Sequence, residues 1–64
     1  MLELFDEEVV NWVNEQSNKY AVTFDEAYAL CVITRYNYSK SEEMIQMLDK
    51  TRNIGFVLRT YYWS

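Results

Sequence analysis

Apolar side chains recur at intervals of three and four residues along most of this 64-residue chain, which is the spacing of one helix face. The first such stretch predicts a helix over Leu2–Asn18, with acidic side chains on the opposite face. Two further stretches predict helices over Thr23–Asn37 and Ser39–Asn53. The chain has no proline and one glycine, which favours helices joined by short turns. We therefore expect a mainly α fold, a compact single domain over residues 1–64 with three to four short helices.

Two helix starts carry a specific signal. Thr23 followed by Glu26 is a capping box, in which each side chain satisfies a free backbone N–H of the first turn. Ser39 followed by Glu42 has the same spacing, and it predicts a second capping box at the start of the third helix.

The last stretch, residues 54–63, fits either a helix or a strand. As a helix, it places on one face Ile54, Val57, Leu58, Tyr61 and Tyr62, and on the opposite side Phe56 and Trp63. As a strand, nearly every residue has β propensity, and the segment would pair with residues 20–24. We favour the helix and keep as the alternative a winged-helix-like α+β fold with a minimal two-stranded sheet.

The same periodicity predicts which side chains form the core. These are Val9, Val13, Phe24, Ala27, Cys31, Ile45, Leu48 and Leu58. A 64-residue domain buries only about 60% of the surface its unfolded chain exposes, so we expect marginal stability and self-association through the aromatic tail.

The charge is unevenly distributed. Residues 1–34 carry seven carboxylates and one lysine, a net −6, whereas residues 35–64 carry five cations and three carboxylates, a net +2. The acidic half disfavours contact with nucleic acid or an anionic membrane, and it favours a basic protein surface.

The sequence gives little support for catalysis. The chain has no histidine and a single cysteine, so it lacks the usual general base, an internal disulfide and a zinc ligand set. Cys31 lies in the most apolar stretch, where a thiol is typically an inert core residue. We expect no enzyme activity, no cofactor and no metal. No apolar run approaches the roughly 20 residues of a membrane span, and the lone thiol suits a cytoplasmic protein.

The remaining class is a protein-interaction module. Large aromatic side chains beyond the needs of a small core, together with polarised charge, are typical of interface anchors and electrostatic steering. The candidate partner-binding residues are the aromatics Trp12, Phe56, Tyr61, Tyr62 and Trp63 and the acids Glu7, Glu8 and Glu15. In size and composition the chain resembles small phage- and mobile-element-encoded regulators that inhibit a host protein, some of which mimic DNA. A homodimer fits the same features.

The alternative function is DNA binding. The order of elements over residues 6–63 resembles a winged helix-turn-helix, which implies a regulator that uses the basic and aromatic second half. That half interleaves cations and aromatics, among them Arg35, Tyr36, Tyr38, Lys40, Lys50, Arg52, Arg59 and Tyr61. The recognition helix of such a domain would begin at Ser39 and would place the carboxylates of Glu42 and Glu43 close to the phosphates, so we rank this function second.

Overall fold

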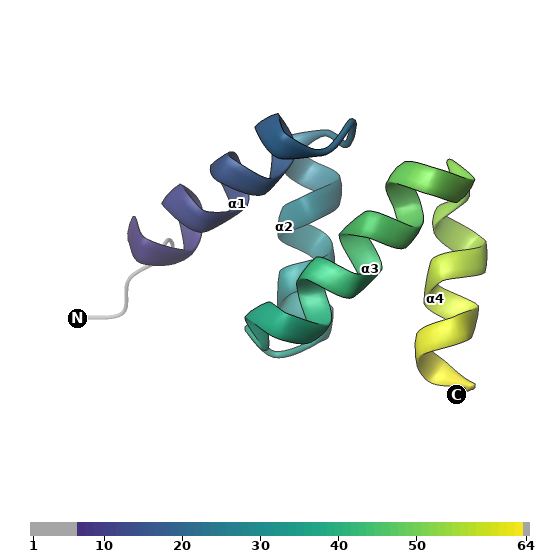
Figure 1. Ribbon diagram of the computed structural model, residues 1–64. Coiled ribbons are helices and arrows are strands. Elements are labelled where there is room, and N and C mark those ends of the chain that lie inside the picture. Colours follow the sequence, from purple (N-terminus) through teal and green to yellow (C-terminus); the bar gives the residue numbers. More distant parts are fainter. Residues whose placement is uncertain (1–6, 64) are drawn as a thin grey trace.

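The computed structural model describes residues 7–63, which form four α-helices (Figure 1). They are α1 (Glu7–Lys19), α2 (Phe24–Ile33), α3 (Tyr38–Thr51) and α4 (Ile54–Tyr62). The predicted mainly α fold with three to four helices is confirmed. The predicted first helix began at Leu2, and its residues 2–6 lie outside the described part of the chain.

The tail is a helix, so the strand alternative is wrong. Residues 7–63 contain no strand, and the two-stranded sheet of a winged helix is therefore not formed by them. The side chain of Asn53 caps α4 by accepting a hydrogen bond from the backbone N–H of Phe56 at 3.0 Å. This local contact starts a helix at a point where β propensity alone allowed a strand.

One of the two predicted capping boxes is correct. The Thr23 hydroxyl accepts from the N–H of Glu26 at 3.1 Å, and the Glu26 carboxylate accepts from the N–H of Thr23 at 2.9 Å. The predicted Ser39 box is wrong, because α3 is capped two residues earlier by Asn37, which accepts from the N–H of Lys40 at 3.0 Å.

Helix α2 ends at Ile33, four residues before its predicted end, in a left-handed turn. The N–H of Tyr36 donates to the carbonyl of Cys31 at 2.8 Å, and the N–H of Arg35 donates to that of Val32 at 2.9 Å. These two bonds define a Schellman motif, which normally places glycine where Arg35 stands. Arg35 (φ 58°) and Tyr36 (φ 64°) both have left-handed backbones, so the usual glycine signal for a helix end is missing from the sequence.

Replacing Arg35 with glycine should therefore stabilise the protein. This left-handed conformation costs a residue with a Cβ atom roughly 1 kcal/mol of conformational free energy, whereas glycine adopts it without that cost. We expect Arg35→Gly to raise the free energy of unfolding by a few tenths to about 1 kcal/mol in urea melts. Arg35→Ala is the matched control, because it removes the same side chain but keeps the strain; equal stability of the two variants would contradict the prediction.

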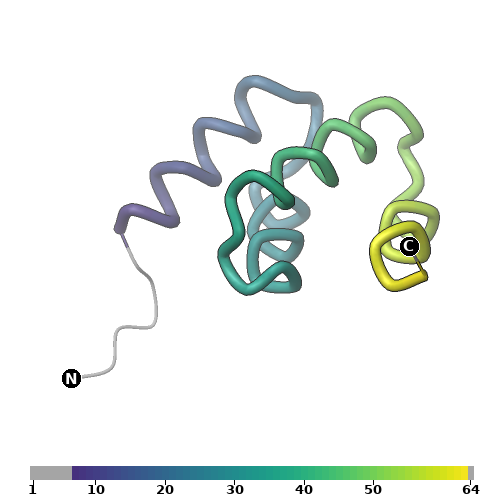
Figure 2. Tube along the Cα trace, turned by 60° about the horizontal axis from the view of Figure 1, so that its bottom comes forward, coloured from purple at the N-terminus to yellow at the C-terminus, as the bar shows by residue number. Residues whose placement is uncertain are grey.

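The helices pack in the order of the sequence. Helix α1 packs on α2, α2 on α3 and α3 on α4, and Figures 1 and 2 show α4 at the opposite end of the molecule from α1. Helix α2 contacts two helices, α1 and α3, while its Val32 remains 43% exposed.

The buried core agrees with most of the predicted set. Six predicted members are buried: Val9, Val13, Ala27, Cys31, Ile45 and Leu48. Phe24 and Leu58 are wrong as core residues, because they are only half-buried and pack against its edge. The core also takes in three apolar side chains that the prediction omitted, Leu30, Met44 and Val57.

Polar contacts hold the loop between α1 and α2 against α3. The Tyr20 hydroxyl donates to the Glu42 carboxylate at 3.0 Å, and that carboxylate also pairs with Lys19 at 3.4 Å. The N–H of Ala21 donates to the carboxylate of Asp49 at 3.2 Å, about two helical turns beyond Glu42 on α3. Glu42 therefore contacts residues that are distant in the sequence. The N-terminus of α3 is capped by Asn37 instead.

Candidate functional site

Exposed large apolar side chains gather on the last helix. Six such side chains occur within residues 7–63, and four of them belong to α4 or its C-terminal cap: Ile54, Phe56, Tyr62 and Trp63. We call these four the outer surface of α4. Trp63 is 80% exposed, the largest fraction of the six. The other two, Val32 and Tyr36, lie at the end of α2 and in the turn after it.

The helical period of the tail produces this surface. Val57 is buried against α3, and Leu58 and Tyr61 on the same side are half-buried. Phe56 and Trp63 are seven residues apart, with Thr60 between them, so they share one flank of the helix. The guanidinium of Arg59 lies 5.7 Å from the centre of the Trp63 ring, a cation–π distance.

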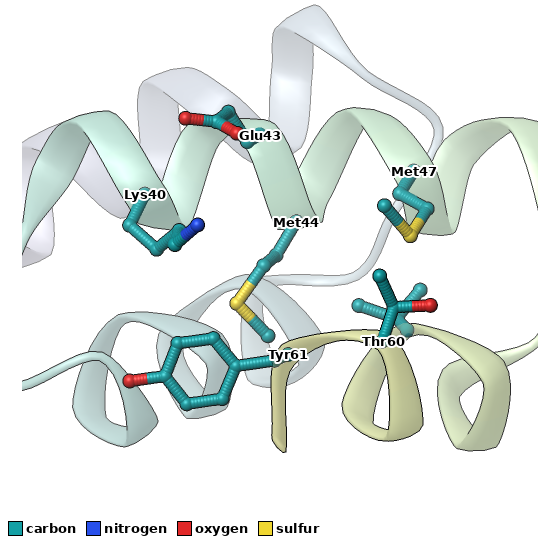
Figure 3. Close-up of a pocket in the computed structure, with 7 residues that line it drawn as sticks. Lys40, Glu43, Met44, Met47, Thr60 and Tyr61 are labelled. Atoms are coloured by element: carbon teal, nitrogen blue, oxygen red, sulfur yellow. The ribbon is translucent and has the colours of Figure 1, made fainter. Parts of the chain in front are cut away.

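A cavity of about 90 Å³ opens between α3 and α4 beside that flank (Figure 3). Its apolar lining comes from Met44 and Met47 on α3 and from Val57 and Tyr61 on α4. Lys40, Glu43 and Thr60 complete the lining. A shallower depression of about 300 Å³ continues along α3 over Glu43, Gln46, Met47 and Lys50. We call the cavity and this depression together the α3–α4 groove.

The lining of the groove carries a small excess of positive charge. Lys40 and Lys50 line it from α3, together with one carboxylate, Glu43. Both lysines are exposed, and neither forms an ion pair with another residue of the described chain. An apolar floor flanked by two lysines suits a ligand that is apolar and carries a negative group.

Of the tail residues predicted from the sequence, Tyr61 lines this groove and the other three are exposed on α4 or its cap. Phe56 and Trp63 are exposed, as the helical interpretation of the tail requires. Tyr62, which that interpretation places on the opposite face with Val57, is 64% exposed as well. Tyr61 is half-buried, lines the cavity and meets the ring of Tyr62 edge-on with a centroid distance of 5.2 Å. Tyr61 therefore supports the groove, whereas the other three are available to a partner.

The predicted residues of α1 lie elsewhere. Glu7, Glu8 and Glu15 are exposed, and α1 lies at the other end of the molecule from α4 (Figure 2). Trp12 is half-buried and stacks on Tyr38 with ring centroids 4.6 Å apart. The eight predicted residues thus divide between two surfaces rather than forming one, and a binding role for the α1 set stays a prediction.

Several groove residues were missing from the predicted site. Met44, Met47 and Thr60 were not among the predicted partner-binding residues. A sequence signal does exist, because Lys40, Glu43, Met44 and Met47 follow helical spacing along one side of α3. That spacing alone does not reveal that α4 packs next to it and leaves a gap.

The chemistry of the described residues does not point to a catalytic centre. No cluster of three or more potential metal-ligating side chains occurs within residues 7–63. Cys31 is fully buried, and burial raises the pKa of its thiol above the ordinary value of 9.0, although Ser41 opposes this by hydrogen bonding. None of the helices in the described range is long and apolar enough to cross a membrane.

Cys31 should accordingly be unreactive in the native protein. Nucleophilic attack requires the thiolate, which burial disfavours, so labelling by a thiol reagent should wait for unfolding. The raised native pKa also means that the unfolded state loses this proton first, so stability should fall as the pH rises above about 9. Cys31→Ala is the control and should remove this part of the alkaline loss. Rapid labelling of the folded protein would contradict the prediction.

Comparison with known proteins adds no relative to this picture: no protein-family model matches the chain, and neither the curated proteins nor the solved structures give a match.

Proposed function

We propose that this protein is a small interaction module that binds a protein partner through the outer surface of α4 and the adjoining groove. It acts as a regulator or inhibitor of that partner in the cytoplasm, without catalysis, in the manner of small phage-encoded proteins. The homodimer belongs to the same proposal, because a second copy is one possible protein partner.

The observation that carries the proposal is the placement of exposed aromatic side chains on a single helix at one end of the fold. Trp63 is 80% exposed and Tyr62 is 64% exposed, although tryptophan is highly buried on average in folded proteins and tyrosine is partly buried. Tryptophan and tyrosine are enriched among the residues that dominate binding energy at interfaces. Their joint exposure at the end of one short helix supports a role in binding.

The exposed acids of α1 supply a second, electrostatic component of the proposal. Glu7, Glu8 and Glu15 lie on α1, far from the α4 surface, and suit a basic patch on a partner. Mimicry of DNA phosphates by these carboxylates belongs to the same component of the proposal.

Site-specific photo-crosslinking tests the α4 interface. A photoreactive phenylalanine analogue replaces Trp63 in one variant and Tyr36 in a second, since Tyr36 is also exposed but lies in the turn before α3. We expect crosslinks to protein from position 63 and few from position 36. Crosslinks that depend on nucleic acid, and disappear with nuclease, would instead favour DNA binding.

A further inference from the structure

We infer that two copies of this chain pair through α4 in an antiparallel arrangement, in which Trp63 of each copy packs over Gly55 of the other. The inference rests on the proposed function and deepens it, because it uses the outer surface of α4 and names a second copy as the partner. Four features of α4 carry it: the position of the glycine, the order of the aromatic side chains, the charge and the exposed area.

Gly55 is the one glycine of the chain, and it lies on the exposed side of α4. Its φ angle is outside the left-handed region, so the backbone does not require glycine here. Apart from its sequence neighbours and the backbone of its own helix, a Cβ atom at this position would meet one described atom, Oδ1 of the exposed Asn53, at 3.3 Å. Glycine within a helix lowers its stability relative to alanine. The close approach of another chain would account for glycine at this exposed position.

The aromatic side chains of α4 are ordered so that the surface complements itself. Gly55, Arg59 and Trp63 follow one another at intervals of four residues and form one row along the exposed side. An antiparallel pair with its twofold axis at Arg59 places Trp63 of one copy at the level of Gly55 of the other. Phe56 lies on the same flank as Trp63, so these two rings meet across the interface. Tyr62 lies on the other side of the row, next to Gly55 of the second copy.

An antiparallel arrangement fits α4 better than a parallel one. In a parallel pair, Gly55 faces Gly55 and the bulky C-terminal ends meet each other, which leaves the glycines opposite an empty space. The antiparallel pair also sets the positive end of each helix dipole beside the negative end of the other. Figures 1 and 2 show α4 at one end of the molecule with the other three helices to one side of it, so its outer side is open to a second copy.

The outer side of α4 carries little charge. Residues 54–63 contain one charged side chain, Arg59, and no carboxylate. The guanidinium lies 5.7 Å from the centre of the Trp63 ring in the same copy. In the pair, the two guanidinium groups approach the twofold axis, where like charges repel each other. Salt screens this repulsion, so self-association should strengthen as the salt concentration rises, whereas binding of an acidic partner would weaken.

The exposed area of α4 supports a weak pair. Phe56, Tyr62 and Trp63 leave roughly 400 Å² exposed on each copy, taking about 200 Å² as the full area of each side chain. Two copies together would then bury about 800 Å², and the stem of Arg59 and the backbone at Gly55 bring this toward the roughly 1,000 Å² of a specific interface. Stable interfaces bury about 1,600 Å² in total, so we expect a dissociation constant between about 10 µM and 1 mM.

Substitutions at Gly55 test the contact in the full chain. Gly55→Ala and Gly55→Leu add side chains where the second copy approaches, and Ala29→Leu, on the exposed side of α2, is the matched control. Sedimentation equilibrium from micromolar to millimolar concentration measures self-association, and circular dichroism verifies that each variant is folded. We expect association about threefold weaker in Gly55→Ala, at least tenfold weaker in Gly55→Leu and unchanged in Ala29→Leu.

Urea melts separate this role of Gly55 from a role in folding. At low micromolar concentration, where the monomer predominates, the urea midpoint of Gly55→Ala should be equal to or above that of the original chain, because alanine favours the helix. A lower midpoint would show that the glycine serves the fold and would overturn its assignment to the pair. Association of Gly55→Leu as tight as that of the original chain would overturn it as well.

Disulfide trapping in a Cys31→Ala background tests the direction of the pair. With an added oxidant, Arg59→Cys should link to itself across the twofold axis. Gly55→Cys should link to Trp63→Cys in a mixture but not to itself, because two copies of residue 55 lie about 12 Å apart along the helix axis. Self-linking at both position 55 and position 59 would assign a parallel pair and overturn the inference.

Removal of the charge separates self-pairing from binding to an acidic protein. Arg59→Gln should associate about threefold more tightly than the original chain at low salt, and added salt should narrow the difference. Weaker association of Arg59→Gln would contradict the arrangement. A chain that stays monomeric at millimolar concentration would overturn the inference but leave the proposed function intact if position 63 still crosslinks to another protein. Absence of those crosslinks as well would overturn both.

Discussion

Replacement of Leu30 with alanine is expected to destabilise the protein by roughly 2–5 kcal/mol, because it removes a fully buried side chain and leaves a cavity that the surrounding helices fill incompletely. Leu30 is the largest of the fully buried side chains and belongs to the core that all four helices share. A chain of 64 residues has a total stability of roughly 3–10 kcal/mol, so the variant should be largely unfolded or close to its midpoint at room temperature.

Val32→Ala is the matched control for that prediction. Val32 lies two residues further along α2 but is 43% exposed, so its truncation should cost less than about 1 kcal/mol. Urea melts of both variants at one temperature give the comparison. Similar losses in the two variants would mean that α2 does not bury Leu30 as the structure places it.

Trp63→Ala and Val57→Ala should separate binding from folding on the same helix. Trp63 is 80% exposed, so its removal should lower the free energy of unfolding by less than about 1 kcal/mol. As an interface anchor, it should contribute about 2 kcal/mol or more to association, which is roughly a thirtyfold change in the dissociation constant. Val57 is fully buried, and Val57→Ala should lower stability by about 1.5–3 kcal/mol.

The choice of Val57 corrects the sequence-based expectation that Leu58 fills this role. Leu58 is half-buried at the edge of the core, so Leu58→Ala should cost less than a full core truncation. Denaturant melts and sedimentation of the two α4 variants test the separation. If Trp63→Ala unfolds the domain as severely as Val57→Ala, the aromatic tail serves packing rather than binding.

Features decided within one turn of the chain were predictable from the sequence. The Thr23 capping box formed as expected because both of its hydrogen bonds lie within four consecutive residues. The Ser39 box failed because its expected partner, Glu42, contacts Lys19 and Tyr20, more than twenty residues away. The spacing of residues within one helical turn does not reveal such a long-range contact.

The tail and the groove show the same limit. Residues 54–63 fit a strand as well as a helix, and only the Asn53 cap and the burial of Val57 against α3 distinguish them. The tail aromatics were singled out as binding candidates because their type and number exceed what a small core needs, and three of them are exposed. The groove was not predicted. Its cavity is lined by Met44 and Met47 from one helix and by Thr60 and Tyr61 from another, so it depends on how the two helices pack.

The packing of each helix on its neighbour in sequence has a kinetic consequence. Contacts between adjacent helices keep the contact order low, and chains of this topology fold within microseconds to milliseconds. Helix α4 packs chiefly on α3, at the end of the series, so it can detach without separating the other three. Its backbone amides should then exchange with deuterium faster than those of α2, at a rate set by this local opening. A partner seated on α4 would slow that exchange, so amide protection would report occupancy of the surface even where no other part of the fold responds.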